Sequence, residues 1–138
     1  MLLNLTVLVG VYLVFTLVLS EAVDPNDAKI DINPRGLQYM CRQDRITISC
    51  SGLKGISVQC SGPAIVLLRN GDPVEPLTVS GRSHSGPSGV GTTIEYVLDR
   101  SRQQTGTYTC RARYSNCQGR NDFDLYSSKL EINFSGNC

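Results

Sequence analysis

The sequence contains no tryptophan, a single histidine and no closely paired cysteines of the CxxC kind. Zinc sites need such paired ligands, and acid–base catalysis needs several titratable groups that converge. The HExxH, GxSxG and phosphate-loop patterns of common enzymes are also absent. The histidine, His84, lies in "GRSHSGPSGVG" and is expected to be a solvated loop residue. These absences predict a protein that is not an enzyme and holds no metal or other cofactor.

Only one long apolar run occurs, "LLNLTVLVGVYLVFTLVL" at Leu2–Leu19. Ser20 and Ala22 follow it at the small-residue positions that signal peptidase prefers, so residues 1–22 are predicted to be a secretory signal peptide. The alternative is an uncleaved membrane anchor, which the short run and the interruption at Asn4 disfavour. No later segment is apolar enough to cross a bilayer. We expect a secreted, extracellular protein that does not insert into a membrane after cleavage.

Neither sign of charge dominates the part that follows residue 22. Loss of the signal removes Glu21 and no basic residue, which leaves 13 basic and 11 acidic residues and a net charge of +2. There is also no run of basic residues. Nucleic acid is therefore not an expected partner.

All six cysteines follow the signal: Cys41, Cys50, Cys60, Cys110, Cys117 and Cys138. An even number of cysteines behind a secretion signal indicates three disulfides formed in an oxidising compartment. The spacing alone leaves many alternative pairings open.

Short β-type segments separated by turn signals fill most of the remaining chain. Residues 23–36 read as a polar lead, with a short edge strand possible at "AKIDI", before a domain at 37–138. "DRITISCSG" and "TTIEYVLD" alternate in polarity, and "AIVLLRNGD" ends in an Asn-Gly turn signal. "PVEPLTVSG" reads as an edge strand, and Gly81–Gly91 as a Gly/Ser loop. With no amphipathic helix in sight, this pattern predicts an all-β sandwich.

Three motifs resemble the immunoglobulin superfamily: "ITISC" (Ile46–Cys50), "LLRNG" (Leu67–Gly71) and "TGTYTC" (Thr105–Cys110). The resemblance covers residues 41–134 and implies a single two-sheet sandwich with Greek-key connections. It implies a core bridge Cys50–Cys110, with Gly106 and Tyr108 forming the corner before the second cysteine. Leu67 stands where the family usually has tryptophan, so the core should be under-filled or repacked.

The same resemblance suggests how the other cysteines pair. In the family the loops that carry Cys60 and Cys117 are neighbours at one end, and the segments that carry Cys41 and Cys138 meet at the other. It therefore implies Cys60–Cys117 and Cys41–Cys138. The alternative for the last residue, Cys138, is a tail thiol or an intermolecular link.

The resemblance also implies where this chain binds its partner. If Leu67 and Cys110 point inward, an apolar strip flanked by charges points outward, as at protein–protein contacts. The candidate residues are Val66, Leu68, Arg111, Arg113, Leu125 and Lys129, with Glu131 beside them. The alternative is that Val66 and Leu68 are scattered surface apolars of no consequence. The loop "SNCQGRND" is a second candidate surface.

The expected function is non-catalytic recognition of another extracellular protein or of a second copy of this chain. Two alternatives stay open: a disulfide-stapled structural matrix component, and a secreted inhibitor or effector that presents one loop. Asn133-Phe134-Ser135 is a glycosylation sequon, so Asn133 is a candidate glycosylation site.

Overall fold

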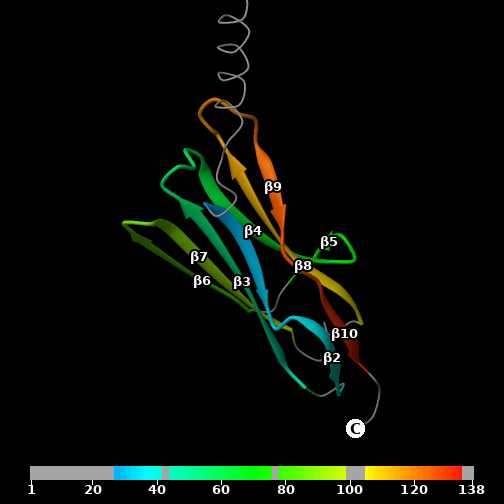
Figure 1. Cartoon of the computed structure of the whole chain (residues 1–138). Helices are drawn as coiled ribbons and strands as arrows, with labels where there is room; N and C mark the ends of the chain where they lie inside the picture. Colours follow the sequence, from blue (N-terminus) through cyan, green and yellow to red (C-terminus); the bar gives the residue numbers. More distant parts are fainter. Residues whose placement is uncertain (1–26, 42–43, 76–77, 99–104, 135–138) are drawn as a thin grey trace, which may run out of the picture.

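A computed structural model describes residues 27–41, 44–75, 78–98 and 105–134, and all the regular structure in these ranges is β-strand. No helix in the described ranges is long and apolar enough to cross a membrane. The strands form two sheets (Figure 1). The smaller sheet has the order β1 (Ala28–Asn33), β3 (Ile46–Gly55), β7 (Gly89–Leu98) and β6 (Thr78–Gly86). The larger has the order β2 (Gly36–Met40), β10 (Leu130–Phe134), β8 (Gly106–Ser115), β4 (Ser61–Arg69) and β5 (Asp72–Pro73), and β9 (Phe123–Tyr126) also pairs with β8.

This strand order is that of an immunoglobulin-like sandwich. Strands that follow one another in sequence, such as β3 and β4, lie in different sheets, while β3 pairs with β7 and β8 pairs with β4. Such crossing connections define the Greek-key arrangement of the fold. The predicted all-β, two-sheet immunoglobulin-like class is therefore confirmed.

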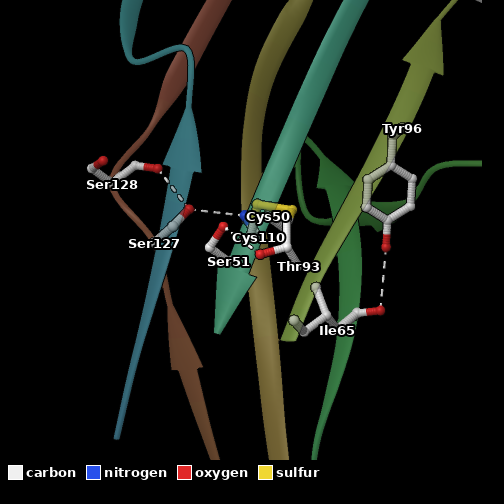
Figure 2. Close-up of a disulfide and its surroundings, with 8 residues drawn as sticks. All are labelled: Cys50, Ser51, Ile65, Thr93, Tyr96, Cys110, Ser127 and Ser128. Carbon is white, nitrogen blue, oxygen red and sulfur yellow. Dashed lines mark hydrogen bonds between the residues drawn. A yellow bond between two sulfur atoms is a disulfide. The ribbon is translucent and has the colours of Figure 1, made fainter. Parts of the chain in front are cut away.

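Alternation along β3 creates the core. Ile46, Ile48 and Cys50 are buried, whereas the residues between them face outward. Cys50 is bonded to Cys110 of β8 across the sandwich, with 5.8 Å between the Cα atoms (Figure 2). These are the two cysteines that the family resemblance paired. The bridge ties the two sheets together at the centre of the apolar cluster.

The core is repacked around the leucine that replaces the usual tryptophan. Leu67 is fully buried and lies in register with Cys110. An aromatic side chain comes from the opposite sheet instead, since Tyr96 of β7 donates its hydroxyl hydrogen to the carbonyl of Ile65, at 3.2 Å (Figure 2). Tyr96 is itself almost fully buried, and burial raises its pKa. The ring therefore fills space beside β4 while its polar end is satisfied by the backbone.

A serine interrupts the last strand of the larger sheet. Ser127, between β9 and β10, donates its N–H to the Cys110 carbonyl, and its hydroxyl oxygen accepts the Cys110 N–H, both at 2.9 Å. The hydroxyl donates in turn to the carbonyl of Ser128, at 2.8 Å (Figure 2). Because Ser127 satisfies the β8 backbone there, the strand can break without leaving a buried N–H unpaired.

One expectation about local structure is confirmed and one needs correction. The short edge strand expected at "AKIDI" is β1, the edge strand of the smaller sheet, and its Ile30 and Ile32 are buried. Alternation over six residues, shown by "AKIDIN", was enough to add a strand to the sheet. Gly81–Gly91 was expected to be a loop, but it lies in the hairpin of β6 and β7. Backbone pairing with β7 orders β6 although its sequence has low β-propensity.

Candidate functional site

The candidate site is the outer face of strands β4, β8 and β9, hereafter the outer face. Residues in register on these strands form rows across it. One row joins Val66, Arg111 and Tyr126, and the next joins Ala64, Arg113 and Asp124. Because Leu67 and Cys110 are fully buried on the inner side, these alternate residues point away from the core.

Arg111 lies on β8, the middle strand of the outer face. Its Nε is buried and has no hydrogen-bond partner among the described residues. Its row neighbours are half-buried Val66 on one side and Tyr126, 59% exposed, on the other. Arg113 differs, because it is more exposed and its Nε lies 3.9 Å from Asp124 Oδ1. A guanidinium between apolar groups is suited to bind a carboxylate of another molecule, to which its N–H groups donate hydrogen bonds.

The other predicted contact residues are distributed differently from the expectation. Leu68 belongs to the outer side of β4 but is only 4% exposed, and it lies opposite Pro73 of β5. Leu125 was predicted to point outward and does not. It is in register with the fully buried Ala112 and packs against the core. Lys129 is exposed in the segment between β9 and β10.

The break at Ser127 explains the error at Leu125 and the omission of Tyr126. Uninterrupted alternation would place Leu125 on the same side as Glu131, which is exposed. The break changes the alternation, so that Tyr126 points outward and Leu125 inward. The only sequence signal is "YSSK", in which two serines interrupt an otherwise strand-like segment.

A second candidate surface lies at the end of the sandwich that carries the cysteine-linked loops. Cys60 and Cys117 are bonded there with 4.0 Å between Cα atoms, again the pair that the resemblance implied. A pocket of about 250 Å³ lies beside this bridge. It is lined by Ser57, Val58, Gln59, Cys60, Gln118 and Arg120.

A stack of two aromatic rings packs against Arg120 at this loop end. The guanidinium carbon of Arg120 lies 4.1 Å from the centre of the Phe123 ring, which stacks on Tyr114 at 4.8 Å. The Tyr114 hydroxyl donates to the carbonyl of Leu53, at 2.6 Å. Burial raises the pKa of Tyr114 to about 12, so this phenol is protonated at neutral pH. The stack therefore anchors Arg120 to the core.

The turn and corner residues lie at the opposite end of β8. Asn70 and Gly71 both have positive φ, 49° and 89°, as a two-residue hairpin turn between β4 and β5 requires. Asn70 accepts the Thr107 N–H through its side-chain oxygen. A Cβ on Gly106 would lie 3.1–3.2 Å from Arg69 and Asn70, so glycine permits this approach. Tyr108 is fully buried, but residues 99–104 of the preceding corner lie outside the described residues.

Two predicted features also lie outside the described residues, the signal peptide at 1–22 and Cys138. The Cys41–Cys138 pairing therefore stays a prediction. Asn133 is described: it is exposed on β10, in register with Tyr39 of the parallel strand β2.

No protein-family model and no curated protein matches this sequence. Several solved structures are similar, among them the following two. A chain of the crystal structure of Dpr2 Ig1-Ig2 in complex with DIP-Theta Ig1-Ig3 has 16% identity and a TM-score of 0.43, over 77% of this chain and 32% of that chain. The N-terminal Ig1-2 module of the Drosophila receptor protein tyrosine phosphatase DLAR has 18% identity and a TM-score of 0.38, over 77% of this chain and 50% of that chain.

This chain therefore spans about a third of one solved chain and half of the other. At such distances function must be inferred from the chain's own residues. The fold rests on the strand order of the two sheets and on the bridge between β3 and β8. By that architecture the chain is an immunoglobulin-like domain.

Proposed function

We propose that this chain is a secreted, non-catalytic recognition domain that binds another extracellular protein, or a second copy of itself, through the outer face. The observation that carries the proposal is Arg111, whose buried Nε lacks a hydrogen-bond partner among the described residues. Leaving a charged group partly desolvated and unpaired costs free energy, and a partner's carboxylate would recover it.

The surroundings of Arg111 support the same proposal. Protein interfaces are enriched in arginine and tyrosine, and their strongest contacts are buried at the centre of the patch. Tyr126 and Val66 flank Arg111 and would exclude water from an ion pair formed there. The nearby Arg113–Asp124 pair, with 3.9 Å between Arg113 Nε and Asp124 Oδ1, would serve as the polar rim. Asp124 Oδ1 itself has no hydrogen-bond partner among the described residues.

Secretion is supported by the signal-like amino terminus and by the disulfides. Cys50–Cys110 and Cys60–Cys117 require an oxidising compartment to form and persist. An extracellular protein is then the natural partner. Among the described residues, no group of three or more metal-ligating side chains occurs.

The test is capture of partners from extracellular medium by the wild-type protein and by Arg111→Glu. Arg82→Glu is the matched control, because Arg82 is an exposed arginine on the smaller sheet. We expect a partner, or self-association measured by light scattering, that Arg111→Glu abolishes and Arg82→Glu retains. Equal binding by all three proteins would show that the outer face is not the contact.

The loop-end pocket is the second candidate contact, because Arg120 is a cation held at its rim by Phe123. Arg120→Glu separates the two surfaces. If that variant loses the partner and Arg111→Glu keeps it, the chain presents a loop to its target, as an inhibitor or effector would. If the wild-type protein captures no partner and does not self-associate, the structural matrix role gains support.

A further inference from the structure

The lower part of the larger sheet exposes an apolar patch on its edge strand. In β2, Leu37 is 52% exposed and Tyr39 is 69% exposed. The strand is paired on one side only, in parallel with β10. Exposed edge strands with apolar side chains favour association with other chains, and natural proteins usually cover or charge them. This patch therefore needs an account of what covers it.

The strand beside it carries the glycosylation sequon. Register in the parallel pair joins Asn133 to Tyr39 and Glu131 to Leu37. Ile132 is buried, so Glu131 and Asn133 point to the outer side, and both are exposed. Neighbours in register on adjacent strands have side chains on the same face. A sugar attached to Asn133 would thus begin beside the Tyr39 ring.

We propose that an N-linked glycan on Asn133 folds back over Tyr39 and Leu37 and forms the cover of this edge. The first sugar of such a glycan, N-acetylglucosamine, has a face of C–H groups that packs on an aromatic ring. Tyrosine offers that ring together with a hydroxyl that stays in water. The bulk of the glycan would also block strand addition at β2.

This inference rests on the secretion that the proposed function includes, because only a chain in the secretory pathway receives the glycan. It also sharpens that function. A glycan over β2 and β10 would leave the rows of Arg111 and Arg113 as the part of the larger sheet open to a protein partner.

The experiment uses the full chain secreted from eukaryotic cells, with intact mass measuring occupancy of Asn133. Ser135→Ala removes the sequon while it keeps the asparagine. Chemical nitration of tyrosine, followed by peptide mass analysis, then compares Tyr39 with Tyr126. Tyr126 is a matched internal control, since it is 59% exposed on the same sheet and lies on β9, which pairs with β8 and not with the sequon's strand β10. We expect Tyr39 nitration to rise at least about threefold in Ser135→Ala and Tyr126 nitration to stay constant.

A second measurement guards against indirect effects of the substitution. The thermal unfolding midpoint is measured for the wild type, Ser135→Ala, Tyr39→Ala and the double variant. Ser135→Ala, which removes the glycan, should lower the thermal midpoint by a few degrees when Tyr39 is present. It should lower the midpoint by clearly less when Tyr39 has been replaced by alanine. An unoccupied Asn133, or equal nitration of Tyr39 with and without the glycan, would overturn the inference. The proposed function is tested with a different variant, Arg111→Glu, and a different measurement, partner binding. The proposed function and the glycan inference can therefore fail independently.

Discussion

The outer faces of the two sheets differ in how their polar groups are satisfied. On the smaller sheet, Ser51 and Thr93 bond to each other at 3.1 Å. Glu95 accepts a hydrogen bond from Ser80 and lies 3.5 Å from Arg82. On the larger sheet, Arg111 has a buried nitrogen without a partner among the described residues, beside an exposed tyrosine.

Both faces belong to the same sandwich and need the same inward alternation, so the core does not impose this difference. A face that satisfies its own polar groups is already complete in water. A face that keeps an arginine unpaired among apolar side chains costs stability unless something else compensates. The contrast therefore supports the proposal that recognition belongs to the larger sheet and that the smaller sheet is a solvated surface.

The largest expected effect is on partner binding when the unpaired cation is reversed. Arg111→Glu should weaken the complex by roughly 30-fold or more, the range of a residue that dominates an interface. Arg82→Glu should change binding by less than about twofold, because it alters only an exposed pair. Surface plasmon resonance against the captured partner measures both. Similar losses from the two variants would remove the distinction between the faces.

The pH dependence of stability tests the contribution of buried Tyr114, which lies at the end of β8 near the cysteine-linked loops. Tyrosine ionises near its ordinary pKa of 10.0 in the unfolded chain, whereas burial raises the pKa of Tyr114 to about 12. Below pH 10, Tyr114 is protonated in both the folded and the unfolded chain, so its contribution to the free energy of unfolding is fully present. Between pH 10 and 12 only the unfolded state ionises, so stability should fall, by up to roughly 2–3 kcal/mol.

Urea unfolding at pH 8.5 to 11.5 measures this loss. Tyr114→Phe cannot ionise and should show a shallower decline, although Tyr96, whose pKa burial also raises, keeps part of the slope. The variant should start about 1 kcal/mol less stable at pH 8.5, because the hydrogen bond to Leu53 is gone. An unchanged slope in Tyr114→Phe would mean that this phenol is not the group responsible.

Ser127→Ala tests whether the strand break holds the outer face in place. Without its hydroxyl, the buried N–H of Cys110 loses its acceptor, which should cost about 1–2 kcal/mol. Ser128→Ala is the neighbouring control, since Ser128 is exposed and contributes its backbone carbonyl. Its cost should stay within about 0.5 kcal/mol. Denaturant midpoints that do not separate the two variants would contradict the role given to Ser127.

That serine also marks the limit of prediction from sequence. The Asn70-Gly71 turn follows from a local pattern with a short-range physical cause, the positive φ of both residues. The central bridge was implied by the family resemblance, since the cysteine count and spacing alone leave the pairing open. The direction of Leu125 does not follow from a local pattern, because it depends on two hydrogen bonds of Ser127, one from its N–H and one to its hydroxyl, with the backbone of Cys110, 17 residues apart. No local propensity distinguishes a serine that breaks a strand from one that continues it.

The assignment of Gly81–Gly91 to a loop was wrong for a related reason, because these residues lie in the hairpin of β6 and β7. The hairpin's Gly- and Ser-rich strand has weak intrinsic preference for any structure, and its order comes from the ladder with β7. Arg111 shows the converse. Its outward direction follows from Cys110 next to it, but its lack of a partner depends on which residues lie across β4 and β9. A contact site is thus harder to predict than the strand that carries it.

The smallest expected effect concerns the face that is already satisfied. Ser51→Ala and Thr93→Val each remove one side of the hydrogen bond between their hydroxyls, and a double-mutant cycle isolates the interaction. Cross-strand pairs of this kind contribute about 0.2–1 kcal/mol, so the coupling should be near 0.5 kcal/mol. Partner binding should not change in any of the three proteins. A face that satisfies its own polar groups gains little from a partner, so these variants should leave the complex intact. A larger loss of binding here than in Arg111→Glu would place the contact on the smaller sheet and contradict the comparison.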